Sequence, residues 1–419
     1  MQLINERLVP AALTDLAGQP LGPPRGLLVG RIADPWPLTS CELDLALSAG
    51  ETLLRGVAAL ALAQHASRIL LAIREDWWSQ LEDFRRRIAA TPIEAIRIPA
   101  AYPLDHNAIV CDLINAGVLQ PVATSQISVV DSQTLIDIAA LSTKQPTAWR
   151  TIAVVGEVDR PALISLPIGT PIGEIVAFVG GAPLGHAVRQ NDPLHGNLVN
   201  ENDAVDLDTR VLYVLSHRHP LLVRATVPAH NQLARATSAC VSCRVCTDTC
   251  PDFINGGTLQ PHLLMNGQAD STSAMVLGCS GCGVCDVTCP AGLAPRSVAH
   301  QLAEELRRRS FRLATPADQQ LTPIVERPLR RLPIETLTAR LGLTAQQPAQ
   351  LPHRTLIPKR LRLPLVLKAG AKRWATVAVG QRFDTAARIA RGEQTPDIFA
   401  PGPGIVCAAD DQTLLVELR

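Results

Sequence analysis

The sequence contains few aromatic residues and carries almost no net charge. Phe, Trp and Tyr make up only 3% of the 419 residues, which leaves few rings to stack on unpaired bases. Lys plus Arg number 39 and Asp plus Glu 38, so the formal charge is +1 and no overall field attracts nucleic acid. These deficits exclude nucleic-acid binding as the expected function. The hydrophobic content of 47% predicts several compact domains rather than a disordered chain.

The sequence also lacks a long uninterrupted hydrophobic run. Its most apolar stretch, residues 53–73, contains Arg55, Gln64, His65 and Arg68. A charge at the centre of a bilayer costs about 2.5 to 3.5 kcal/mol, so this stretch is not expected to span a membrane. The first residues, MQLINERLVPAALTDL, have neither the basic segment nor the apolar core of a secretory signal. The sequence therefore predicts a cytoplasmic protein without a transmembrane segment.

Nucleotide-binding and catalytic motifs are missing as well. The chain has no G-x-G-x-x-G after a strand and no Walker A sequence. Gly180, Gly181 and Gly185 are expected to end a helix rather than to cradle a phosphate. The ten His residues are scattered, and no catalytic residue is predicted. A lipoyl- or biotinyl-carrier domain is excluded at the C-terminal end because no Lys follows Lys372.

Cysteine, by contrast, is concentrated in one block. Eight of the 11 Cys residues lie between positions 240 and 289, in two runs that share the pattern C-x2-C-x2-C-x3-C-P. This is the ligand pattern of bacterial two-cluster ferredoxins, in which the fourth Cys of each run binds the other cluster. The predicted ligands of one [4Fe-4S] cluster are Cys240, Cys243, Cys246 and Cys289, and those of the second are Cys279, Cys282, Cys285 and Cys250.

Two four-cysteine zinc sites are the structural alternative. Zinc requires neither the third Cys of each run nor the prolines that follow Cys250 and Cys289, whereas both belong to the ferredoxin pattern. Two adjacent clusters that each store one electron predict an electron relay. The remaining Cys41, Cys111 and Cys407 lie on apolar segments and are expected to be buried, inert thiols.

Periodicity and turn residues predict a multidomain α/β chain with small β modules. Residues 53–98 alternate between helix and strand, and the same alternation continues at 107–116, 128–130 and 132–141. Strands are expected at 151–158 and 162–167, a helix at 171–181, and strands at 211–216 and 221–227. The cysteine block precedes a helix at 296–309, and short strands fill the last 60 residues. The predicted units are an α/β domain at 1–145, a β-grasp module at 150–228, a dicluster domain at 229–312, a linker at 313–358 and an all-β domain at 359–419.

Positive charge is concentrated in residues 291–391. This segment holds 19 Lys and Arg against 6 Asp and Glu, a local charge of +13 in a nearly neutral chain. A solvated, Arg-rich face is the simpler interpretation, and a docking surface for an acidic partner is the alternative.

The cysteine block and its surroundings resemble the PduS-type cobalamin reductases, a group related to the RnfC-like proteins of the Rnf electron-transport complex. The resemblance rests on LQPHLLM between the two runs, on CPAGLAPRSVAHQLAEELR after them, and on YPLDHNAIVCDLINAG upstream. It implies that TIAVVGEVDRPALISLPIGTPIGEIVAFVGG is a soluble-ligand-binding β-grasp (SLBB-like) module and that the tail, LRLPLVLKAGAKRWATVAVGQRF, belongs to a barrel-sandwich hybrid domain. It also implies a flavin-type α/β domain that uses FMN and NADH.

This sequence differs from that family at the flavin loop. Family members carry a glycine-rich loop of the form G-x-G-G-A-G-F-P, whereas residues 21–45 here read LGPPRGLLVGRIADPWPLTSCELDL. Gly22, Gly26 and Gly30 are scattered, and Pro23 and Pro24 remove amide donors, so no phosphate cradle is expected. The α/β domain is therefore predicted to be degenerate.

Three functions follow from these observations. The leading prediction is a protein that passes single electrons through two [4Fe-4S] clusters to a redox partner protein or a corrinoid enzyme, in the cytoplasm or a bacterial microcompartment. The second is an active NADH- and FMN-dependent cobalamin reductase. The third is a non-redox scaffold protein in which the clusters are structural.

Overall fold

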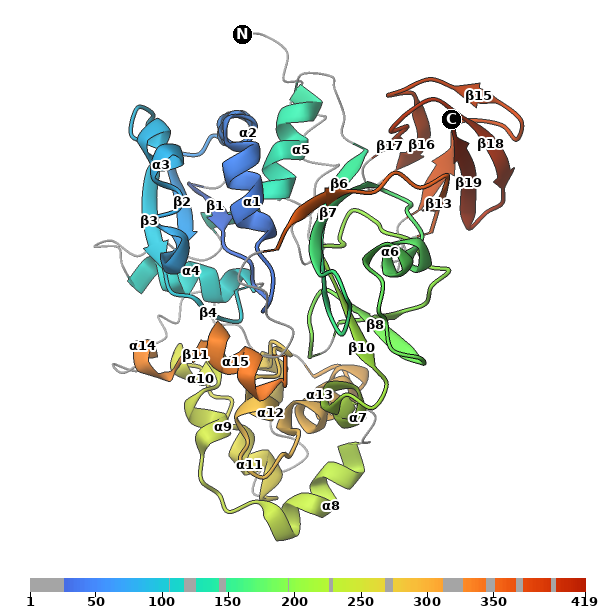
Figure 1. The fold of residues 1–419 in the computed structure, drawn as a ribbon. Coiled ribbons are helices and arrows are strands. Elements are labelled where there is room, and N and C mark those ends of the chain that lie inside the picture. The colour runs from blue at the N-terminus through green and yellow to red at the C-terminus, as the bar shows by residue number, and fades with distance from the viewer. Residues whose placement is uncertain are drawn as a thin grey trace.

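The computed structural model divides into four units (Figure 1). It describes residues 26–104, 106–116, 126–142, 148–194, 196–225, 229–267, 274–311, 327–343, 351–366, 372–392 and 397–419. The α/β unit lies at the upper left of Figure 1 and the cysteine-rich unit at the bottom. The unit predicted as a β-grasp module, called the β-grasp unit below, lies at the centre, and the C-terminal β unit lies at the upper right.

The α/β unit is built on a four-stranded parallel sheet with the order β3-β2-β1-β5. Buried aliphatic side chains on both faces of its strands require helices on both sides, as parallel sheets generally do. One core contains side chains from α2 and α5, and a second core on the opposite face contains side chains from α4. The bounds are β1 Leu27–Ile32, α1 Cys41–Ser48, α2 Gly50–Ala63, β2 Arg68–Arg74, the 3-10 helix η1 Glu75–Trp77, α3 Glu82–Ile88, β3 Glu94–Ile98, β4 Ala101–Tyr102, α4 Asn107–Ala116, β5 Ile127–Asp131 and α5 Ser132–Ser142.

The β-grasp unit is a six-stranded mixed sheet with the order β12-β7-β6-β10-β8-β9. Helix α6 covers one face, and its Ile172, Ile175 and Val176 pack on buried residues of β6 and β7. Gly180 ends α6 with a φ of 68°, a left-handed conformation that favours glycine. The bounds are β6 Trp149–Gly156, β7 Ala162–Pro167, α6 Ile172–Val179, β8 His186–Gln190, β9 Leu198–Val199, β10 Val211–Ser216 and α7 Pro220–Ala225.

The cysteine-rich unit consists of short helices around a small core of its own. Its longest helix, α13, buries one face through Val298, Ala299, Ala303 and Leu306 and exposes its charged face. The bounds are α8 Ala229–Ala239, α9 Val245–Asp248, α10 Pro251–Ile254, α11 Pro261–Met265, the 3-10 helix η3 Ala274–Gly278, α12 Val284–Thr288 and α13 Pro295–Arg308.

The C-terminal unit is formed by two small antiparallel sheets, with the orders β13-β19-β18-β15 and β14-β16-β17. Their inward-facing side chains, including Leu361, Leu363, Ile389 and Val416, share one core. The bounds are β13 Arg360–Pro364, β14 Arg373–Ala375, β15 Arg382–Phe383, β16 Arg388–Gly392, β17 Ile398–Phe399, β18 Gly404–Ala409 and β19 Thr413–Leu418.

The segment predicted as a linker joins the other units together. Within it lie α14 Arg327–Arg330, β11 Leu332–Pro333, α15 Ile334–Arg340 and β12 His353–Thr355. Strand β11 pairs with β4 of the α/β unit, and β12 extends the β-grasp sheet alongside β7. Five leucines of this segment are buried: Leu332, Leu337, Leu341, Leu343 and Leu351. A composition rich in Pro and Gln gives no indication of these apolar contacts.

Several other predictions differ from the structure. The sequence predicts a strand at 221–227, but Pro220–Ala225 is helix α7, which begins at a proline suited to the first helical position. Strand β1 lies within the region interpreted as a disrupted flavin loop, and β8 and β9 lie in a region given no structure. Cys407 is exposed, because β18 alternates its side chains between the core and solvent, whereas Cys41 and Cys111 are buried as predicted.

No single helix in the described ranges is both long and apolar enough to cross a membrane. One bent pair, Cys41–Ser48 with Gly50–Ala63, meets the length and composition criteria together, with an angle of 96° between the helices.

Candidate metal centre and junction

The two cysteine runs form loops that wrap toward each other in the cysteine-rich unit. Each run continues into a short helix, α9 in the first run and α12 in the second. Thr249 and Thr288 occupy equivalent positions, one residue before the fourth Cys of each run, and their hydroxyl oxygens lie 3.1 Å apart. The repeat in sequence is therefore also a repeat in space, and it brings Cys250 and Cys289 across from the opposite run.

The backbone of both loops passes through the left-handed region at equivalent positions. The second run uses glycine there, Gly281 with φ 77° and Gly283 with φ 73°. The first run has Ser242 with φ 52° and Arg244 with φ 64°. The two loops therefore share one backbone conformation, which glycine adopts at the lowest steric cost.

Electrostatic interactions show which thiols are neighbours. Burial raises the pKa of Cys246 to about 11, and the thiols of Cys289, Cys243 and Cys240 contribute to the rise. Burial also raises the pKa of Cys285 well above its usual range, with added contributions from Asp286 and then from Cys282, Cys250 and Cys279. Each neighbourhood combines three thiols of one run with the fourth thiol of the other.

The donor set fits iron–sulfur clusters better than single metal ions. Each neighbourhood supplies four thiols, three from one run and one from the other, and the described residues named there include no His ligand. Zinc would hold four sulfur atoms about 2.3 Å from a single centre. A four-iron cube instead spreads its thiolates around a cage of iron and sulfide, and thiolate is the ligand it requires.

The two sets of predicted ligands differ in exposure. In the first loop, Cys243 is exposed and Cys240 is half-buried, whereas Cys282 and Cys285 of the second loop are buried. Burial is one of the factors that set the potential of a cluster, so the two sites are not equivalent.

Tyr102, which sequence analysis did not single out, lies where three units meet. Its ring is buried at the end of β4, and its hydroxyl oxygen is 2.7 Å from the carbonyl oxygen of Cys282 and 2.8 Å from Asp192 Oδ2. The hydroxyl donates its proton to one of these two acceptors at a time. Tyr102 thus joins the α/β and β-grasp units directly to the backbone of the second cysteine loop.

The Tyr102→Phe variant is expected to lower the free energy of unfolding by about 1–3 kcal/mol, because it leaves buried acceptors without their donor. It should also shift the reduction potential of the cluster at Cys282, because the Tyr102 hydroxyl holds the backbone carbonyl of that ligand in place. EPR-monitored redox titration measures the potential. Tyr213→Phe is the matched control, because the Tyr213 hydroxyl donates to the Pro37 carbonyl. Equal potential shifts in both variants would contradict the assignment.

Buried charges occupy the carboxyl edge of the parallel sheet, between β1 and β5. Open sheets of this kind bind ligands at such a switch point. Here Arg31 and Asp131 lie at the ends of the two strands, and Asp34 and Glu42 follow β1, all of them almost fully buried. Arg31 donates from Nη1 to the Leu104 carbonyl, and the Ser132 amide donates to Glu42 Oε2 over 2.9 Å. The edge is filled by an ionic cluster of the chain's own side chains.

The carboxyl groups of this cluster differ in ionisation. Burial raises the pKa of Glu42 to about 8, helped by the charges of Asp131 and Asp34, and burial raises the pKa of Asp34 to about 6. Burial also acts to raise the pKa of Asp131, but Arg210, the Thr134 amide and Arg31 outweigh it and lower that pKa. At neutral pH, Glu42 is therefore protonated beside an ionised Asp131.

The Glu42→Gln variant is expected to be more stable than the wild type at pH 8 and little changed at pH 4. When the chain unfolds, Glu42 ionises near its usual pKa of 4.5, whereas the folded protein keeps the proton up to about pH 8. The folded state binds more protons across this window, so wild-type stability falls as the pH rises. Each pH unit is worth about 1.4 kcal/mol. Urea midpoints at both pH values measure the effect, and an equal gain at each would contradict it.

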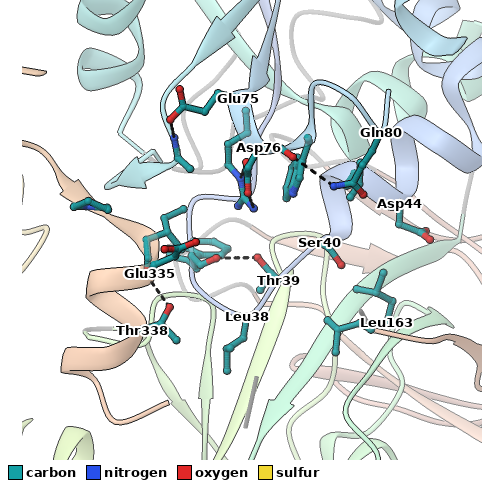
Figure 2. Close-up of a pocket in the computed structure, with 18 of the residues that line it drawn as sticks. Leu38, Thr39, Ser40, Asp44, Glu75, Asp76, Gln80, Leu163, Glu335 and Thr338 are labelled. Carbon is teal, nitrogen blue, oxygen red and sulfur yellow. Dashed lines mark hydrogen bonds and ion pairs between the residues drawn. The ribbon is translucent and has the colours of Figure 1, made fainter. Parts of the chain in front are cut away.

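A cavity of about 620 Å³ lies beside this edge, between the α/β unit, β7 and α15. Figure 2 shows Glu75, Asp76 and Asp44 from the α/β unit, with Glu335 of α15 on another side. Among the described lining residues Arg74 is the one permanent cation, and it is paired with Asp76 over 2.7 Å and stacked on Trp77 at 3.7 Å. The carboxylates outnumber this cation, and the cation is already paired, so the described lining offers no charge partner for a phosphate dianion and does not fit FMN.

Comparison with known proteins agrees with this geometry. Residues 239–294 match a 4Fe-4S dicluster domain and residues 151–197 match an SLBB domain. The cobalamin reductase PduS of Salmonella typhimurium is 32% identical over 404 residues, which cover 91% of this chain and 87% of that protein. The chain belongs to the PduS family. The PduS protein of Citrobacter freundii is 31% identical and is covered over 70% of its length, with 74% of this chain.

The dicluster and SLBB predictions are thereby confirmed, and the PduS-family chain is an iron–sulfur redox protein. Two structures of an NAD+-reducing [NiFe]-hydrogenase, one H2-reduced and one air-oxidised, are also similar. Their TM-scores are 0.46 and 0.40 at 19% and 18% identity, with 76% and 77% of this chain covered. The chain spans 63% and 60% of those hydrogenase chains, less than two thirds of their length.

Proposed function

We propose that this PduS-family chain passes single electrons through two [4Fe-4S] clusters to a redox partner protein or a corrinoid enzyme. The observation that carries this proposal is the grouping of eight thiols into two sets of four, each with three members from one run and one from the other. Such a cluster stores one electron at a time, and two clusters in one small unit form a relay. The location implied by the family resemblance is the cytoplasm or a bacterial microcompartment.

The roles of the residues follow from their positions. Cys240, Cys243, Cys246 and Cys289 would hold the outer cluster. Cys279, Cys282, Cys285 and Cys250 would hold the inner cluster. Tyr102 positions the inner loop, and Arg296 does the same by donating from Nε to the Gly281 carbonyl over 2.6 Å.

In this proposal the α/β unit is a degenerate flavin-type domain that serves as a scaffold. The ionic cluster at the sheet edge and the acidic cavity support this role, because neither provides a site for a flavin phosphate. The two C-terminal sheets, which share one core, support the predicted barrel-sandwich hybrid domain.

The second candidate is an NADH- and FMN-dependent cobalamin reductase, since the relatives from Salmonella typhimurium and Citrobacter freundii are named cobalamin reductases. The absorbance of anaerobically purified protein separates the two. Under the proposal, dithionite bleaches the cluster band and NADH does not, with or without added FMN. NADH-driven bleaching would establish the second candidate, and clusters that resist dithionite would favour a structural role.

A further inference from the structure

The two cysteine loops differ in what covers them. Three units cover the second loop: Arg296 and Tyr102 donate hydrogen bonds to its carbonyl groups, and a Cβ at Gly283 would lie 3.1 Å from Leu194 Cδ1. From Cys279 to Cys285 only Ser280 is exposed. In Figure 1, α12 lies toward β10 and α15, inside the molecule.

The first loop instead faces outward. Val241, Ser242, Cys243 and Arg244 are all exposed, and Val241 is 79% exposed. In Figure 1 the adjacent helices α8 and α11 form the lower end of the molecule. An apolar side chain beside an exposed cluster ligand is a site where a partner can approach the cluster closely, and electron-transfer rates fall steeply with distance.

The backbone of this loop is held in a conformation that its residues disfavour. Ser242 and Arg244 have left-handed φ values where the second loop has glycine. The Ser242 hydroxyl accepts a hydrogen bond from Asn266 Nδ2 over 3.4 Å, and Arg244 forms no ion pair in the described part of the chain. Both loops share this backbone conformation, so the first loop differs from the second by carrying exposed serine and arginine side chains where the second has glycine.

The charge around this loop is positive. Arg244 is exposed on it, and Arg235 is exposed on α8, five residues before Cys240. The carboxylate of Asp248, which follows the loop in sequence, is neutralised by Arg330 at 3.0 Å. Val241, Cys243 and Arg244, together with Arg235 of the preceding helix, are here called the outer-loop surface. Its charged members are both cationic, and its apolar member is Val241.

We propose that the outer-loop surface docks an acidic redox protein and is the port through which electrons enter or leave the clusters. This inference rests on the proposed relay. It adds which face of the protein the partner contacts, which cluster exchanges electrons with the partner, and the sign of the partner's charge. In each exchange one electron passes between the partner's redox group and the outer cluster, so that one is oxidised as the other is reduced. Carboxylates of the partner pair with Arg244 and Arg235, and its apolar contact covers Val241.

The test uses a plant-type ferredoxin of strongly negative net charge as the probe and a positively charged cytochrome c as the comparison. Redox titration first gives the cluster potentials, and stopped-flow absorbance then follows exchange with the ferredoxin in the downhill direction. Arg244→Glu should lower the second-order rate constant at low ionic strength by at least about five-fold, and Val241→Ser should lower it at every ionic strength. The Arg244→Glu effect should vanish in about 0.5 M salt.

Arg55→Glu, an exposed substitution on α2, makes the same charge change far from the port and is the matched control. With cytochrome c, Arg244→Glu should raise the rate rather than lower it. If Arg244→Glu and Arg55→Glu exchanged electrons with ferredoxin at equal rates, the outer-loop surface would not be the docking site. Arg235→Glu, which lies outside the cysteine run, should also lower the ferredoxin rate while leaving dithionite reduction and the EPR signals of both clusters as in the wild type. If the wild type itself shows no reducible clusters, it is the relay that fails.

Discussion

Replacing Cys250 with alanine is expected to abolish the inner cluster, although Cys250 belongs to the first cysteine run. Its thiol lies among those of Cys279, Cys282 and Cys285, and burial raises its pKa to about 12, so a metal must displace its proton. Loss of this ligand should lower the iron content from about eight to about four per chain. Iron analysis and EPR of the dithionite-reduced protein measure the result.

The mirror variant provides the control. Cys289→Ala should abolish the outer cluster, as should Cys243→Ala, and both should leave the signal of the inner cluster in place. Cys407→Ala should change neither signal, because this exposed thiol lies in the C-terminal unit. If Cys250→Ala removed the same signal as Cys243→Ala, each run would bind its own cluster and the crossed arrangement would be wrong.

Replacing Arg210 with alanine is expected to destabilise the junction of the α/β and β-grasp units by about 3–5 kcal/mol. Arg210 immediately precedes β10, and its Nη2 lies 3.5 Å from Asp131 Oδ1 of β5, with both side chains almost fully buried. Without the guanidinium, an ionised carboxylate remains in a medium of low dielectric constant. Hydrogen exchange at the amides of β1 and β5 measures the local loss of stability.

An exposed ion pair within the α/β unit serves as the comparison. Arg68 and Glu94 lie 2.8 Å apart, with side chains that are 38% and 53% exposed. Such pairs contribute about 0–1 kcal/mol, so Arg68→Ala should have a small effect. If Arg68→Ala and Arg210→Ala lowered the free energy of unfolding equally, burial of the Arg210–Asp131 pair would not explain the destabilisation.

The prediction of a two-cluster [4Fe-4S] domain could be made from sequence because the information for it is local. Three cysteines spaced by two residues, a fourth three residues later and a following proline define the ligand pattern without reference to the rest of the chain. The helices and strands from residue 107 to 167 were predictable for a similar reason, since each has the apolar period of its own element.

Other features depend on contacts between distant residues. Strand β1 was missed because the interruption of its apolar run by Gly30 and Arg31 resembles a loop, yet Arg31 is buried among carboxylates from β5 and α1. A Cβ at Gly30 would lie 2.4 Å from Leu71 Cδ2 of the neighbouring strand, so a larger residue there would force that side chain to shift. The sequence gives no indication of the role of Tyr102, because its partners Asp192 and Cys282 are 90 and 180 residues away.

The predicted linker illustrates the same limit. Its composition of Pro and Gln is typical of a connector, but β11 and β12 each pair with a strand of another unit. Two or three residues of pairing leave no periodic pattern in the sequence, so this arrangement becomes visible only in the folded chain.

A relay of two [4Fe-4S] clusters without flavin is tested most directly on anaerobically purified protein by iron, sulfide and flavin analysis combined with EPR. We expect about eight irons and eight sulfides per chain, no flavin, and signals from two clusters after dithionite that NADH does not produce. Bound FMN with NADH-reducible clusters, or zinc in place of iron, would contradict it.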